Sequence, residues 1–187
     1  AFGAQVIGAV PPLLSIGIPL VWAGMNWQQL TTGFQPELLL LTVRTLGLAL
    51  AATLFAGIAA LLLAIAKRWN HAKWLSSVTF LAGMGYAIPG AVLALALLVL
   101  GGPWQLSPIL LLLWGYTDRF LAVNKGGIDA ALERLSPSLD EAATGLGLRW
   151  PAVLRRVHLP LLRGPRFVGS LLVFVDTVKE LPLTIAL

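Results

Sequence analysis

The chain contains no cysteine and few charged residues, and these two deficits exclude several kinds of protein. Without cysteine it forms neither a disulfide nor a thiolate metal site. Charged residues make up 11% of the 187 residues, whereas soluble domains carry about 25%. Hydrophobic residues make up 58% of the chain, so in water it would expose large apolar surfaces. We therefore expect lipid to be its solvent.

The sequence also lacks the residue patterns of common enzymes and nucleotide-binding proteins. It has no His-Glu-x-x-His pattern, no Ser/His/Asp arrangement and no phosphate-binding loop. Gly145-x-Gly147 matches part of a dinucleotide-binding fingerprint, but Trp150 occupies the position of the third glycine. His71 and His158 stand alone in basic segments, which favours interfacial positions over metal sites. We expect no enzyme activity, metal site or bound cofactor in this chain.

Long uncharged runs predict membrane helices, because a bilayer core about 30 Å thick takes roughly 20 residues of helix. Val6 to Met25 and Thr45 to Ala66 are two such runs, and the second is the clearest span. Trp74 to Thr117 is too long for one span, and Gly101-Gly102-Pro103 predicts a turn within it. We expect membrane helices within five ranges: Gln5 to Asn26, Pro36 to Lys67, Leu75 to Leu100, Pro108 to Asn124 and Phe167 to Leu187.

The distribution of basic residues predicts which loops face the cytoplasm. The net charge is +5, and the basic residues lie between the apolar runs, as in a membrane protein rather than a nucleic-acid-binding one. Lys67, Arg68 and Lys73 follow the second predicted span, and most of the other basic residues follow the fourth. The intervening loops, 26–37 and 101–107, contain neither Lys nor Arg. The positive-inside rule therefore predicts a multi-pass protein of the bacterial inner membrane with its basic loops in the cytoplasm.

Two weaker patterns concern the packing of helices and the position of tryptophans at the membrane–water interface. Alanines recur at every fourth position of the second span, which favours either close helix packing or an ordinary alanine-rich helix; they are Ala52, Ala56, Ala60 and Ala64. Five tryptophans lie at predicted span ends, as in an aromatic belt: Trp22, Trp27, Trp69, Trp74 and Trp104.

In the stretch 125–166 charges return, while apolar residues keep helical spacing. Ser136-Pro137 predicts a helix start, with serine as the cap and proline in the first turn. Gly145 and Gly147 predict its end. A second helix, Ala152 to Leu159, is expected to follow and to end before Pro160. This stretch therefore predicts a helix-turn-helix on the cytoplasmic face.

The same stretch carries a long motif with fixed spacing. Glu141-Ala142-Ala143 is followed by three residues, Gly147, nine residues, and Val157-His158-Leu159-Pro160. This resembles the EAA loop in the permease subunits of binding-protein-dependent ABC importers. In that family the pattern ends in Ile-x-Leu-Pro, so the one departure here is Val157. Arg44-Thr45-Leu46 and Pro89-Gly90 also resemble the family, and the resemblance covers most of the chain.

The resemblance implies a fold and a set of partners. It implies an all-α, polytopic membrane helix bundle, with one incomplete permease domain over 1–187 and a coupling loop at 125–166. In this family the motif helix docks on a cytoplasmic ABC ATPase, present in two copies, which binds the ATP and Mg. A periplasmic substrate-binding protein, membrane lipid and a second permease half or subunit are the other implied partners. The implied ATPase contacts are Glu141, Ala142, Ala143, Gly147, Val157, Leu159 and Pro160.

Three charged residues interrupt the last predicted span. Asp176, Lys179 and Glu180 follow i, i+3, i+4 spacing, so we expect them to share one helix face. A charge at the bilayer centre costs about 2.5–3.5 kcal/mol on insertion scales, and pairing of Asp176 with Lys179 would offset part of this. The group therefore faces either the substrate pathway or the neighbouring helices that it fastens.

The substrate class depends on a shorter resemblance. The segment Phe174 to Pro182 contains Lys-Glu-Leu-Pro, which is typical of the ferric-iron branch of the permease family. Ferric iron is therefore the expected substrate. Importers for thiamine, polyamine, sulfate and phosphonate share the EAA loop and stay open as alternatives. The rival classes are an intramembrane enzyme, against which the lack of a catalytic constellation argues, and a passive channel or membrane scaffold, which would not need a coupling loop.

Overall fold

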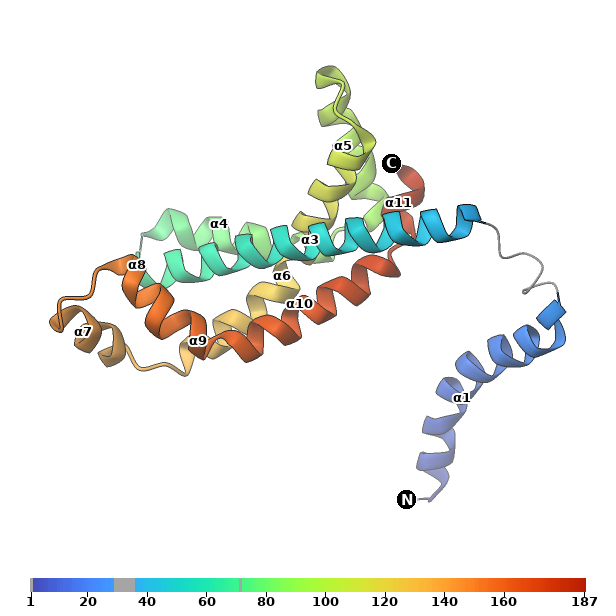
Figure 1. The fold of residues 1–187 in the computed structure, drawn as a ribbon, viewed down its shortest axis with the longest axis horizontal. Helices are drawn as coiled ribbons and strands as arrows, with labels where there is room; N and C mark the ends of the chain where they lie inside the picture. Colours follow the sequence, from blue (N-terminus) through green and yellow to red (C-terminus); the bar gives the residue numbers. More distant parts are fainter. Residues whose placement is uncertain (1, 29–35, 71) are drawn as a thin grey trace. The chain divides into compact units, whose positions relative to one another are not determined.

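The computed structural model describes residues 2–28, 36–70 and 72–187 of the chain. Every regular element within these residues is a helix, so the predicted all-α class is confirmed (Figure 1). The chain divides into two compact units, Ala1–Arg44 and Thr45–Leu187, and each is treated by itself. His71 lies outside the described residues.

The helices follow one another along the chain with short connections. In order they are α1 (Phe2–Met25), α3 (Pro36–Trp69), α4 (Lys73–Gly83), η1 (Gly85–Ala87), α5 (Gly90–Gly101), η2 (Gly102–Trp104), α6 (Pro108–Glu133), α7 (Ser138–Gly145), α8 (Trp150–Val153), η3 (Leu154–His158), α9 (Leu159–Leu161), α10 (Arg163–Val178) and α11 (Pro182–Ala186).

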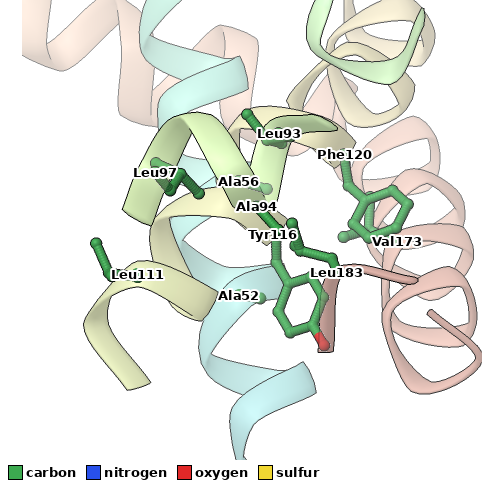
Figure 2. Packing of buried hydrophobic residues seen from close by; sticks show 10 residues of the cluster. All are labelled: Ala52, Ala56, Leu93, Ala94, Leu97, Leu111, Tyr116, Phe120, Val173 and Leu183. Carbon is green, nitrogen blue, oxygen red and sulfur yellow. The ribbon is translucent and has the colours of Figure 1, made fainter. Parts of the chain in front are cut away.

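Helix α3 is the one unbroken helix within the described residues that is long and apolar enough to cross a membrane. Its alanine face is buried: Ala49, Ala52, Ala56, Ala60 and Ala64 are each at most 2% exposed. These alanines pack against side chains of α5, α6 and α10, so the close-packing interpretation of the stripe is confirmed (Figure 2). Leu54, Ile58 and Leu62 on α3 are more than half exposed.

The third predicted span is wrong as one continuous helix. Helix α4 with η1 and helix α5 with η2 meet at a bend of 117°, and together they are long and apolar enough for a broken span or a re-entrant loop. The break falls at Ile88–Pro89, where Ile88 is extended with φ −76° and ψ 126°. A residue that precedes proline is driven out of the helical region by the proline ring, so the helix stops there.

The end of α6 also differs from the sequence-based prediction. Helix α6 runs to Glu133, past the boundary predicted at Asn124, so the stretch from Lys125 does not begin as a loop. Lys125 is buried and pairs with Asp129 one turn along the same helix. Charged residues interrupt the apolar run of α6, so it is not among the described helices that are apolar enough over a sufficient length to cross a membrane.

The last predicted span is also broken. Helix α10 begins at Arg163 and ends at Val178, and the short helix α11 follows after residues 179–181. Both helices pack against α6, and α11 also packs against α5. The main apolar core forms where these helices meet α3, and Leu183 and Val173 are fully buried in it (Figure 2). The continuous helix from Phe167 to Leu187 is therefore wrong.

Candidate functional site

The first helix of the motif-bearing loop begins close to its predicted start. Helix α7 starts at Ser138, after Pro137, with Asp140 and Glu141 in its first turn. The Ser138 N–H donates to the Ser136 hydroxyl at 3.3 Å, so Ser136 satisfies one of the free N–H groups at this end. Acidic residues in a first turn also suit the positive end of the helix dipole.

The prediction that glycine ends α7 is confirmed, and the backbone there forms a Schellman turn. The Gly147 N–H donates to the Thr144 carbonyl at 2.9 Å, and the Leu148 N–H donates to the Ala143 carbonyl at 3.1 Å. Gly147 has φ of 81°, in the left-handed region that favours glycine. A Cβ atom added there would meet no atom within 4 Å. Within this chain, Gly147 is therefore required by backbone conformation rather than by crowding.

The motif residues of α7 divide between two faces of the helix. Glu141, Ala142 and Gly147 are exposed, whereas Ala143 is only 6% exposed and faces the chain's own interior. Of the two alanines that the resemblance implies as ATPase contacts, Ala142 is therefore open to a partner and Ala143 is covered by the chain itself. Leu146 is 84% exposed beside the turn. It is a large apolar side chain that the motif did not indicate, and it widens the exposed surface.

The second arm of the loop continues through the proline that was expected to end it. Helical turns run from Trp150 to Leu161, with a π turn over Leu154–His158. Pro160 has no N–H and its ring would collide with the carbonyl one turn back, so the helix widens before it. The motif residues Val157 and Leu159 are half-buried, and Pro160 is exposed.

A mostly buried ion cluster ties α7 to the end of α3. Arg68 Nε lies 2.7 Å from Asp140 Oδ2, and the two side chains are 13% and 17% exposed. The other guanidinium nitrogens donate to the Leu132 carbonyl at 2.8 Å and to the Leu135 carbonyl at 3.2 and 3.3 Å. One arginine therefore holds the end of α6, the connection to α7 and the first turn of α7.

His158 belongs to the same cluster, so the expectation that it stands alone at an interface is wrong. Its Nε2 lies 2.9 Å from Asp140 Oδ1, and its side chain is 1% exposed. Burial lowers the pKa of His158 below the ordinary 6.5; Asp140 opposes this shift and Arg68 adds to it. Arg68, Asp140 and His158 are called the anchor cluster below.

Two aromatic rings cover the anchor cluster. The Trp69 ring lies 4.1 Å from the Trp150 ring and 5.8 Å from the His158 ring, measured between centroids. Trp69 therefore packs within the loop region rather than in an aromatic belt. Trp22, Trp74 and Trp104 are each more than half exposed, which suits the belt interpretation. Because the three rings come from α3, α8 and η3, they join the second arm of the loop to α3.

The charged group near the end of α10 also differs from its predicted arrangement. Asp176 Oδ1 pairs with Lys179 Nζ at 2.7 Å, as expected, and the lysine is 70% exposed. Glu180 lies beyond the last residue of α10, so the three residues do not share one helix face. Its carboxylate lies 3.6 Å from Arg119 Nε on α6, with both side chains less than a fifth exposed.

Arg119 joins the two helix breaks. Its Nη1 donates to the carbonyl of Ile88, directly before the break that precedes α5. The same side chain pairs with Glu180 in the break before α11. A Cβ atom added at Gly90 would lie 2.6 Å from Glu180 Oε1, so only glycine permits this approach. The guanidinium also lies 5.9 Å from the centre of the Tyr86 ring. We call Arg119 and Glu180 the break pair.

Sequence reasoning missed Arg68, Asp140 and Arg119 as functional residues. In the sequence, Arg68 served only as one of the basic residues after the second predicted span, which indicate the loops that face the cytoplasm. Arg119 lies inside the range predicted as the fourth span, and an ionisable residue there indicates function by default. That signal was available in the sequence. Nothing in the spacing of Arg68 and Asp140, which are 72 residues apart, predicted their contact.

Comparison with known proteins adds no assignment, because no family model matches the chain and no curated protein sequence matches it significantly. Within the described residues, no group of three or more His, Asp or Glu side chains would hold a metal ion. The candidate site therefore depends on the motif and on the geometry of the anchor cluster and the break pair.

Proposed function

We propose that the chain is the membrane-spanning subunit of an ATP-driven, binding-protein-dependent importer, and that α7 is its coupling helix. The observation that carries this proposal is the fold of the spaced motif. Its glycine forms the turn after α7, and its Glu141 and Ala142 lie exposed beside that turn. Leu146 adds apolar surface at the same place. Small and apolar side chains on a short exposed helix suit docking into a groove of another protein.

The anchor cluster gives the proposal a mechanical basis. A force on α7 reaches α3 through the Arg68–Asp140 pair and reaches α6 through the carbonyl contacts of Arg68. These contacts are mostly buried, so they are stiffer than surface pairs that water and salt screen. Closure of a partner ATPase would therefore move α3 and α6 together. Alternating access needs such a rigid-body movement of helices around a substrate site.

The broken helices support a substrate pathway near the break pair. In many transporters the substrate site is formed by discontinuous helices at membrane depth. Here the breaks before α5 and α11 meet at Arg119 and Glu180. We place the pathway or its gate beside Glu180, with Asp176 and Lys179 nearer its exposed side. The Lys-Glu-Leu-Pro resemblance supports ferric iron as the substrate, and thiamine, polyamine, sulfate or phosphonate remain the competing solutes.

This function requires a multi-pass arrangement in the bacterial inner membrane. Helix α3 supplies one span, and the bent pair of α4 and α5 supplies a broken span or a re-entrant loop. Two charges of α6 are paired within the bundle, Arg119 with Glu180 and Lys125 with Asp129, which lowers the cost of holding them among apolar helices. The proposed partners are a pair of ATPase subunits that bind ATP and Mg, a periplasmic binding protein and a second permease half.

The test is ATP hydrolysis that depends on delivered substrate. The full-length protein would be reconstituted in vesicles with its ATPase and binding protein, and hydrolysis measured with and without loaded binding protein. We expect Ala142→Trp to abolish the stimulation by adding bulk at the docking surface. Ala96→Trp, at an exposed position on α5, is the matched control and should keep it. Normal stimulation in Ala142→Trp would refute the coupling role, and solute flux without ATP would favour a passive channel.

A further inference from the structure

A cavity of about 360 Å³ lies between α3, α6 and α10, apart from the motif loop and the break pair. Its walls are partly apolar and partly charged. Leu54 and Ile58 line it from α3, and Phe167 lines it from α10. These three side chains are 64%, 57% and 70% exposed, so the cavity opens on an exposed apolar surface of the helices.

The inner wall of the cavity carries a buried amide without a partner. The Asn124 side chain is fully buried, and neither its Oδ1 nor its Nδ2 makes a hydrogen bond within the described residues. Glycines surround this amide closely. A Cβ atom at Gly169 would lie 2.7 Å from Asn124 Oδ1, and one at Gly57 would lie 3.3 Å from Nδ2 and 3.7 Å from Ser170 Oγ. An unpaired buried amide lowers the stability of the fold, so an occupant that hydrogen-bonds to it would be held there.

Two arginines lie at one end of the cavity. Arg163 and Arg166 occupy the first turn of α10, and neither forms an ion pair within the described part of the chain. No carboxylate lines the cavity. This end of α10 continues from the motif loop, which the positive-inside rule places in the cytoplasm. The cavity therefore offers cations at headgroup level, polar groups below them and an apolar wall open to the side.

We propose that this cavity binds an anionic phospholipid of the cytoplasmic leaflet. The phosphate lies against Arg163 and Arg166, the glycerol and ester oxygens lie toward Asn124 and Ser170, and one acyl chain lies along Leu54 and Ile58. Basic cavities between membrane helices on the cytoplasmic side are suited to such headgroups. Free phosphate would use the arginines but would leave the apolar wall unused. The proposal rests on the membrane placement given under Proposed function.

The test is lipid selectivity of the full-length protein, purified with the partners that accompany it. Native mass spectrometry would compare binding of phosphatidylglycerol with that of phosphatidylcholine after delipidation. We expect the wild type to prefer phosphatidylglycerol, and Arg163→Gln/Arg166→Gln to weaken that binding about thirtyfold, the effect of removing two basic contacts with an anionic lipid. The control, Lys67→Gln/Arg134→Gln, removes the same charge from exposed sites outside the cavity and should change binding less than about twofold.

The outcomes separate this proposal from the proposed function. Equal binding of the two lipids by the wild type, or equal losses in the two double variants, would overturn the lipid site. Displacement of phosphatidylglycerol by inorganic phosphate at millimolar concentration would also overturn it, in favour of a solute site. Substrate-stimulated ATP hydrolysis, measured on the same preparations, reports on the importer assignment. Selective lipid binding without that stimulation would leave the lipid site standing and refute the importer.

Discussion

Replacement of Arg68 by lysine tests whether the anchor cluster fixes the coupling helix. Lysine keeps the positive charge but has a compact ammonium in place of the planar fork of donors. Arg68 reaches the Asp140 carboxylate at 2.7 Å and the Leu132 carbonyl at 2.8 Å from different nitrogens. A lysine would satisfy one of these acceptors and leave the other to water or unpaired.

The expected loss of stability follows from how deeply the Arg68–Asp140 pair is buried. With side chains only 13% and 17% exposed, the Arg68–Asp140 pair falls between a surface pair and a buried one. Removing one partner of a fully buried pair costs about 3–5 kcal/mol, so for Arg68→Ala we expect a loss at the lower end of that range, about 3 kcal/mol. Arg68→Lys loses the carbonyl contacts alone, for which we expect about 2 kcal/mol. That loss corresponds to roughly thirtyfold easier opening of the segment that Arg68 holds.

Hydrogen exchange of the α7 amides in the assembled complex measures this opening. We expect faster exchange in residues 138–147 of Arg68→Lys, together with ATP hydrolysis that responds less to delivered substrate. Lys67→Gln alters the exposed neighbour and serves as the control. Asp140→Asn should give a similar effect, and the double variant should cost less than the sum of the single variants because both remove one contact. Wild-type exchange in both single variants would refute the role of the cluster.

Three further predictions follow from the site. Gly147→Ala should destabilise the end of α7 by about 1 kcal/mol because φ is 81° there, while Gly147→Asn should cost less, as measured by hydrogen exchange. Because burial lowers the pKa of His158, the unfolded state binds more protons, so the loop should lose stability as pH falls below 6.5. Thermal unfolding of His158→Gln should lack that dependence, and an unchanged pH profile would contradict this. Glu180→Gln should slow transport at normal protein level more than Asp176→Asn, because the Glu180 partner, Arg119, is mostly buried, whereas the Asp176 partner, Lys179, is 70% exposed; equal transport rates would exclude a pathway role.

The sequence determined the helical class, the position of most helices and the local form of the motif. Uncharged runs predicted helices, because lipid leaves backbone groups no partner except one another. Gly147 predicted the end of α7, because its preference for a left-handed backbone is a local property. The alanine stripe predicted a face of α3 that permits close packing, and that face is buried. These features depend on residues within a few turns of one another.

Breaks within helices could be predicted only in part from the residues beside them. Pro89 lies inside the third predicted span, and because membrane helices tolerate proline, this residue alone does not predict a break. The proline ring favours a break there, and the structure stabilises it because Gly90 lets Glu180 approach and Arg119 binds the carbonyl that the break frees. The acceptor carbonyl, the carboxylate and the guanidinium come from three separate helical segments, and their meeting is not encoded in any one of them.

The tertiary structure alone decided which polar groups meet and which motif residues remain exposed. Arg68 and Asp140 lie 72 residues apart, and only the packing of α3 beside α6 brings them together. Ala142 and Ala143 are identical in chemistry, yet one is exposed and the other buried, because the anchor cluster sets the rotation of α7. Helical periodicity predicts which residues share a face of a helix. Contacts with distant helices specify which face is buried, because burial is a property of the packed chain rather than of any segment within it.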